Sequence, residues 1–125
     1  MAESTITKKA LAAGFKELLK EKSFDTISVQ DITKSCGLNR QSFYYHFHDK
    51  YELVNWIYYN EALRVVANDL NYDNWNVKVL ELLEIMKNDD HFYQRTLRNA
   101  KGNEFQDYLF DFFTEVFTGI IANIA

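Results

Sequence analysis

Four side chains suited to binding nucleic acid lie close together in the segment GLNRQSFYYHFHDKYEL, residues 37–53. Arg40 and Gln41 are of the types that hydrogen-bond to base edges in the major groove, and the hydroxyls of Tyr44 and Tyr45 can bind phosphate. A helix turns by about 100° per residue, which places these residues away from Phe43 and Phe47, the two phenylalanines of FYYHF, with Arg40 at the edge. The spacing therefore predicts a short helix that its phenylalanines anchor in a core and whose polar face points outward.

Helix-capping residues define the elements that position this face. Ser28 and Asp31 have the S-x-x-D spacing of a capping box at the start of a helix. Gly37 suits the left-handed position that follows that helix, and Asn39 can cap the next one. Lys50 falls in the first turn of a third helix, where its ammonium and the free backbone N–H groups can face a phosphate. Helix, tight turn and helix in this order are a helix-turn-helix layout.

The same run resembles the recognition segment of the TetR family of bacterial transcriptional regulators, with its small turn, aromatic pair, His-Phe, Lys and acidic-Leu pair. The match extends upstream to Ile6 and includes the spacing S-F-x-x-I-S-V-x-D-I. From Trp56 onward the chain resembles the subgroup that includes regulators of dihydroxyacetone kinase operons. The resemblance implies an all-α fold, in which an N-terminal three-helix helix-turn-helix DNA-binding domain, residues 1–48, joins a shortened C-terminal helical domain for ligand sensing and dimerisation, residues 49–125.

The predicted DNA contacts combine the outward face with polar side chains near it. They are Ser28, Gln30, Asn39, Arg40, Gln41, Ser42, Tyr44, Tyr45, His46 and Lys50. The alternative for Arg40, Gln41, Tyr44 and Tyr45 is an ordinary solvated helix face. A metal site at His46 and His48, with Cys36 nearby, is also conceivable, but histidines two apart are poorly placed on a helix, so no metal ligand is assigned. The resemblance implies instead that His46 contacts phosphate or packs.

Composition narrows the class of protein. The chain has no proline, four glycines and one cysteine, which favours an all-α fold without an internal disulfide. No glycine-rich phosphate loop, H-E-x-x-H or nucleophile motif is present, so we expect neither an enzyme nor a cofactor. No signal peptide and no run of about 18 apolar residues occurs, which predicts a protein of the bacterial cytoplasm without a membrane contact.

Charge is divided unevenly along the chain. Residues 1–50 hold eight Lys or Arg and six Asp or Glu, whereas residues 51–125 hold six and twelve. The net charge of −4 therefore hides a basic excess in the half that carries the helix-turn-helix. Because this excess is small, affinity for double-stranded DNA would also depend on helix N-termini and hydrogen bonds.

The remaining apolar residues recur at helical spacing. We expect a first helix over residues 5–22, later helices over 49–69, 77–86 and 105–124, and a short helix after Asp89 or Asp90. In residues 77–86 the spacing places Leu80, Leu83 and Met86 inward. A predicted pocket for an unidentified small-molecule effector is lined by Trp56, Tyr59, Met86, Phe92, Tyr93, Tyr108 and Phe112. The alternative for these residues is plain core packing, and the resemblance favours the pocket.

The last predicted helix carries apolar residues over a wide arc, more than one contact within a small subunit can cover. It predicts a homodimer whose interface contains Phe113, Phe117, Ile120, Ile121 and Ile124. The resemblance implies a longer chain than 125 residues, so we expect either a truncated chain or a rebuilt subunit interface. The alternative function is an antagonist that keeps the fold and pairs with a full-length relative without binding an operator.

Overall fold

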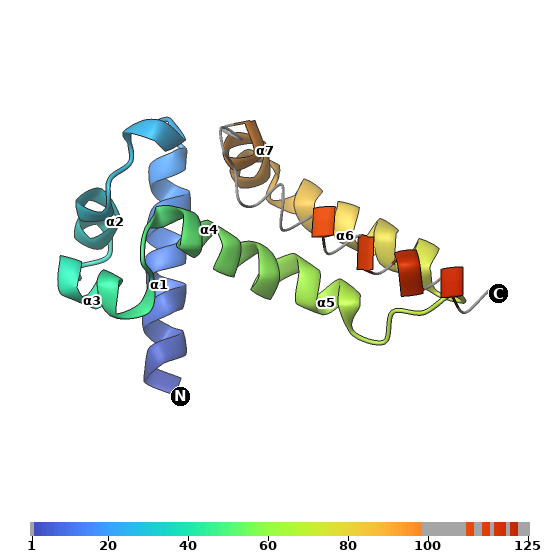
Figure 1. The fold of residues 1–125 in the computed structure, drawn as a ribbon. Helices are drawn as coiled ribbons and strands as arrows, with labels where there is room; N and C mark the ends of the chain where they lie inside the picture. The colour runs from blue at the N-terminus through green and yellow to red at the C-terminus, as the bar shows by residue number, and fades with distance from the viewer. Residues whose placement is uncertain (1, 99–109, 112–113, 116, 120, 123–125) are drawn as a thin grey trace.

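The computed structural model of the protein describes residues 2–98, 110–111, 114–115, 117–119 and 121–122. Among these residues every regular element is helical (Figure 1). The elements are α1 (Ala2–Leu19), a 3₁₀ turn η1 (Phe24–Thr26), α2 (Val29–Ser35), α3 (Arg40–His46), α4 (Lys50–Tyr58), a π-helical turn η2 (Tyr59–Leu63), α5 (Arg64–Ala67), α6 (Trp75–Asn88) and α7 (Asp90–Arg98). The all-α prediction is confirmed.

The predicted caps form the helix-turn-helix. Ser28 Oγ accepts from the Asp31 amide at 3.1 Å, and Asp31 Oδ2 accepts from the Ser28 amide at 3.0 Å, which is the reciprocal capping box. Gly37 has φ of +72° and so closes α2 in the left-handed conformation. Asn39 Oδ1 then accepts from the Ser42 amide at 2.9 Å at the start of α3. Each helix boundary in this region therefore follows from local chemistry.

The helix predicted over residues 49–69 is present as three consecutive helical pieces. α4, η2 and α5 follow one another without a break and lead away from α1 as one arm (Figure 1). The π-helical turn in the middle was not predicted, because apolar spacing does not distinguish one wider turn from regular helix. The arm ends at Asn68, and Asp69 takes a positive φ of 60° in the following turn.

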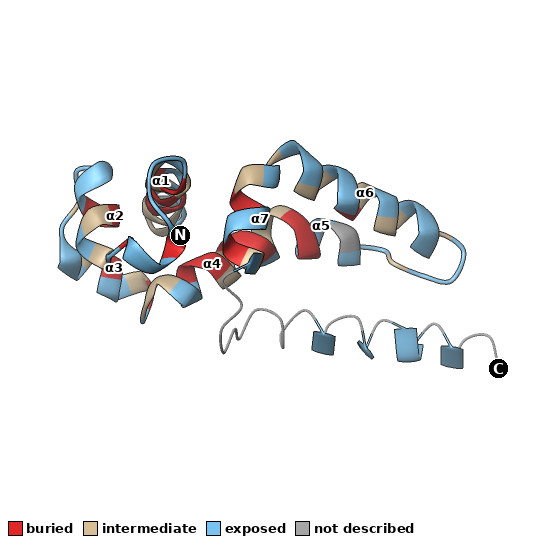
Figure 2. Ribbon diagram, turned by 90° about the horizontal axis from the view of Figure 1, so that it is seen from above, coloured by how far each residue is buried: buried red, intermediate tan, exposed pale blue. Residues whose placement is uncertain are grey.

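The arrangement of α6 corrects part of the sequence analysis. Leu82, rather than Leu80 or Leu83, points inward, because α6 packs against the arm of η2 and α5 through the side that carries Leu82. Leu80 and Leu83 are 62% and 55% exposed, so their predicted inward placement is wrong. Met86 is partly buried, as expected. The outer side of α6 is accordingly exposed along most of its length (Figure 2).

The main core joins the helix-turn-helix to α7. Phe15 of α1 makes edge-to-face contacts with Phe24 and Phe92, at centroid distances of 5.8 and 6.2 Å. Tyr58 of α4 stacks on Tyr93 of α7 at 5.3 Å. All five residues belong to one buried cluster, and Figure 2 colours parts of α1, α4 and α7 as buried. Because one core includes residues from both predicted domains, the boundary between residues 48 and 49 stays a prediction.

Candidate nucleic-acid interface

The outward face of α3 carries the residues singled out from the sequence. Arg40, Gln41, Tyr44 and Tyr45 are all exposed, and together they line one hollow at the surface. Among the large hydrophobic side chains of the described residues, Tyr45 is the most exposed, with 83% of its surface accessible. Such a face presents donors, acceptors and two aromatic rings to solvent, which are groups that can hydrogen-bond to a nucleic acid.

α3 is anchored from behind by its phenylalanines. Phe43 is completely buried and Phe47 is 4% exposed, with ring centroids 5.7 Å apart. His46 lies beside α1, where Nδ1 is 3.4 Å from Ser4 Oγ. A helix of seven residues would not be stable alone, so this packing fixes the direction in which the outward face points.

Two of the predicted DNA contacts already act as helix caps within the fold. Ser28 and Asn39 use their side-chain oxygens as helix caps, although both residues are exposed. The amide of Ser28 and the neighbouring Lys22 lower the pKa of Asp31, which keeps the box ionised. Gln30 lies one helical position after Val29 and is exposed at the start of α2. Its contact with DNA stays a prediction.

Lys50 lies at the first position of α4, as predicted, but its ammonium turns inward. Nζ donates to the carbonyl oxygens of Phe24 at 2.7 Å and Ile27 at 2.9 Å, with Asp25 O at 3.5 Å. Burial lowers the pKa of Lys50, and the Asp25 carboxylate partly opposes this. The ammonium thus satisfies the end of η1, and its contact with phosphate stays a prediction.

The predicted pocket residues do not enclose one cavity in the described part of the chain. Phe92 and Tyr93 are buried in the main core, and Met86 packs at its edge. Trp56 and Tyr59 line a separate surface hollow beside α1. Tyr108 and Phe112 lie outside the described residues.

Two of the predicted interface residues can be placed. Phe117 is 41% exposed and Ile121 64% exposed. Phe117 makes an edge-to-face contact with Trp75 of α6, at a centroid distance of 6.4 Å. Phe113, Ile120 and Ile124 lie outside the described residues.

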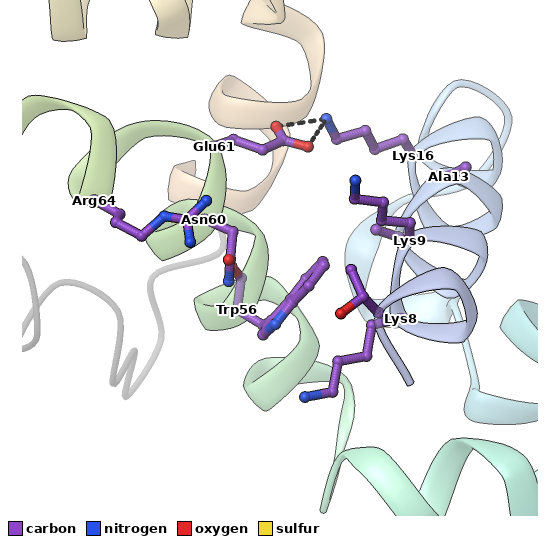
Figure 3. A pocket seen from close by; sticks show the side chains of 10 residues that line it. Lys8, Lys9, Ala13, Lys16, Trp56, Asn60, Glu61 and Arg64 are labelled. Atoms are coloured by element: carbon purple, nitrogen blue, oxygen red, sulfur yellow. Dashed lines mark hydrogen bonds and ion pairs between the residues drawn. The ribbon is translucent and has the colours of Figure 1, made fainter. Parts of the chain in front are cut away.

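Sequence reasoning missed a cavity between α1 and the arm of α4, η2 and α5. It has a volume of about 520 Å³, and Trp56 is the only predicted pocket residue that lines it. Lys8, Lys9 and Lys16 extend into this region from α1 and Arg64 from α5 (Figure 3). The cavity depends on the angle at which the two helices cross, which no sequence pattern encodes.

The described residues contain neither a candidate metal-ion cluster nor a candidate membrane-spanning helix. No cluster of three or more His, Cys, Asp or Glu side chains that could hold a metal ion is found there. Within the same residues, no helix is long and apolar enough to cross a membrane.

A helix-turn-helix with an exposed polar recognition face, joined to further helices, defines a regulator-type DNA-binding fold. Residues 11–57 match the family "Bacterial regulatory proteins, tetR family", and residues 73–125 match "Transcriptional regulator C-terminal region". The chain therefore belongs to the tetR family, as the sequence predicted. This family consists of transcription regulators, so the prediction that the chain is not an enzyme is confirmed.

Named relatives agree with this assignment. The chain is 34% identical over 95 residues to the HTH-type dhaKLM operon transcriptional activator DhaS of Lactococcus lactis subsp. lactis, an alignment that includes 76% of this chain. A solved structure of the dihydroxyacetone kinase operon activator DhaS is similar with a TM-score of 0.71 and 28% identity, over 94% of this chain. The chain spans 51% of the length of the first relative and 65% of the second.

Proposed function

We propose that the protein is a sequence-specific, DNA-binding transcriptional regulator that inserts α3 into the major groove of an operator. The observation that carries the proposal is the outward face of α3, where four hydrogen-bonding side chains are exposed while Phe43 is fully buried. In this orientation Arg40 and Gln41 read base edges, and Tyr44 and Tyr45 contact phosphates.

We further propose a DhaS-like role, in which the regulator controls a dihydroxyacetone kinase operon. Support comes from the 34% identity with a protein of that name and from the similarity to a solved DhaS chain. Regulation would require an effector with different affinities for two positions of the reading head. The arm of α4, η2 and α5 would transmit that difference, because it connects α3 to α6 and α7.

A homodimer completes the proposal. Two copies related by a two-fold axis would present two α3 helices to half-sites about one DNA turn apart. The exposed apolar residues Phe117 and Ile121 support this assembly. A dimer would also compensate for the small basic excess of each head, because two heads double the number of phosphate contacts.

Selection of bound sequences from random duplex DNA tests the function. The parent chain should enrich one motif, and Arg40→Ala or Gln41→Ala should weaken binding to it by about 1–3 kcal/mol and relax base preference. Tyr44→Ala should weaken binding to every sequence alike, since phosphate contacts carry no sequence information. The matched control is Lys87→Ala, which removes an exposed cation from α6. Failure to enrich any motif would favour the antagonist that binds a full-length relative.

A further inference from the structure

The cavity between α1 and the arm is lined by an unusual excess of cations. Lys8, Lys9, Lys16 and Arg64 contribute four positive charges, and Glu61 contributes the one carboxylate of the lining. Figure 3 shows the lysines on α1 facing the side chains of the arm across the space. The cavity lies at the junction between the helix-turn-helix and the rest of the molecule, and it shares no residue with the hollow on α3.

One of the cations is neutralised by its neighbours. Lys16 Nζ donates to Glu61 at 2.7 and 2.8 Å and to Asp89 at 2.5 Å. Lys16 therefore ties α1 to η2 and to the residue before α7. Lys8, Lys9 and Arg64 form no ion pair with a carboxylate in the part of the chain that the structure describes. The cavity thus retains positive charge that a bound anion would neutralise.

The backbone beside the cavity is also irregular. Asn60 and Glu61 reach the lining from the π-helical turn η2. The side-chain amide nitrogen Nδ2 of Asn60 donates to the backbone carbonyl oxygen of Trp56 at 3.0 Å. Single π turns inside α-helices occur frequently at functional sites. The extra residue in the turn shifts the side chains after it around the helix. The turn thus helps set which residues of the arm face α1.

The remaining lining defines the size and polarity of an occupant. Ala12, Ala13 and the ring of Trp56 supply apolar surface beside the cations. The volume of about 520 Å³ falls within the range of about 300–1,000 Å³ that is typical of small-molecule sites. The lining suits a small molecule that combines anionic groups with a short uncharged part.

We propose that this cavity is a binding site for a small organic anion that carries a phosphate or several carboxylates, with Lys8, Lys9 and Arg64 as its charge partners. The bound anion contacts α1 and α5 together and so links the reading head to the arm. This binding does not depend on the reading of DNA by α3, because the two sites share no residue. It also differs from the aromatic pocket that the sequence predicted, of which it contains Trp56 alone.

Trp56 provides a direct readout. The chain has two tryptophans, so the full chain with Trp75→Phe retains Trp56 at the cavity as its single tryptophan, which can be excited selectively over tyrosine. Pyrophosphate and citrate are titrated as probes at constant ionic strength, which keeps general screening unchanged. We expect a saturable change of Trp56 emission with at least one probe and a rise of the melting temperature at saturation. Glycerol, a neutral molecule of similar size, should produce neither effect.

Charge-matched variants test the assignment of the residues. Lys9→Gln with Arg64→Gln should weaken probe binding about tenfold, or about 1.4 kcal/mol. The control, Lys34→Gln with Lys87→Gln, removes two cations that do not line the cavity and should leave probe affinity unchanged. Circular dichroism confirms that both variants fold.

Three results would overturn the proposal. They are the absence of any saturable change with either probe, equal weakening in the control variant, and a cavity variant that binds both probes normally but loses affinity for duplex DNA. The last result would show that these cations bind DNA phosphates and not a small anion. Failure of the parent chain to bind duplex DNA would contradict the proposed function while leaving anion binding intact, so the two failures are distinguishable.

Discussion

At the scale of single residues, Lys50 shows how a cation expected at DNA becomes part of the fold. Its ammonium donates to the carbonyl oxygens of Phe24 and Ile27 at the end of η1, and the Phe24 oxygen also accepts from the Ile27 amide. Lys50→Met keeps the approximate length of the side chain but removes the charged donor to both oxygens, so the free energy of unfolding should fall by about 1–3 kcal/mol. Urea denaturation measures the change, with Lys34→Met on the exposed side of α2 as the control. Unchanged stability together with weaker DNA binding would assign Lys50 to phosphate instead.

Three buried or paired groups make the fold sensitive to alkaline pH. Burial raises the pKa values of Tyr58 and Tyr93 well above their usual 10. Burial alone would lower the pKa of Lys16, but its hydrogen bonds to Asp89 and Glu61 outweigh that and raise it above 10.5. A raised pKa means that the unfolded chain loses the proton first, so this part of the stability is complete below pH 10 and declines above it.

Urea denaturation between pH 7 and 11 should therefore show stability falling from about pH 10. Tyr93→Phe should reduce the slope, because it removes one of the titrating groups. It should cost little at pH 7, since the buried Tyr93 hydroxyl has no hydrogen-bond partner among the described residues. Lys50, whose pKa is lowered, contributes in the opposite direction. A slope that is identical in the parent and in Tyr93→Phe would contradict the assignment.

At the scale of elements, the contact between α1 and α2 depends on Gly14. A Cβ at this position would overlap Ser35 Oγ and would lie 3.4 Å from the Ile32 carbonyl oxygen. Gly14→Leu should therefore push the helices apart and destabilise the protein by about 1–3 kcal/mol, in the range of overpacked cores. Gly14→Ala is the graded control, because the Ser35 hydroxyl can rotate and alanine favours the helix. Thermal unfolding measures both, and equal stability of parent and leucine variant would refute close packing here.

The elements also show which features the sequence encodes. The boundaries of α2 and α3 were predictable, because Ser28, Gly37 and Asn39 act within one helical turn of their own position. The π turn and the orientation of α6 were not predictable from the sequence. Leu80, Leu82 and Leu83 are equally apolar, and packing against the neighbouring arm selects Leu82.

The candidate sites also differ in how far local sequence predicts them. The outward face of α3 follows from helical periodicity once the phenylalanines are assigned to the core. The direction of the Lys50 side chain and the cation-lined cavity depend on segments far apart in the chain. Lys8 and Arg64, for example, both line the cavity although 55 residues lie between them in the sequence.

At the scale of the whole molecule, apolar surface gathers on one region. Val77, Leu80 and Leu83 recur every three residues along α6 and are each more than half exposed. Phe117 contacts Trp75 at the start of α6, and Ile121 is also exposed. Apolar patches of this kind on a small subunit commonly mark protein–protein contacts.

A second copy of the chain is the partner that we predict for this surface. Phe117→Asp with Ile121→Asp places two charges where apolar side chains would be buried between subunits. Sedimentation should show a dimer for the parent at micromolar concentration and a monomer for this variant. The loss should be large, because an unpaired charge buried in an interface is strongly unfavourable.

The matched control places the same charges beside the interface residues. Thr114→Asp with Thr118→Asp adds two carboxylates at exposed positions of the same segment, and it should leave the dimer intact. A dimer doubles the α3 contacts with DNA, so the monomeric variant should also lose cooperative binding to a two-half-site operator while a single half-site is still bound weakly. A parent chain that sediments as a monomer would contradict the dimer, and it would favour the antagonist, which needs a full-length relative to complete its interface.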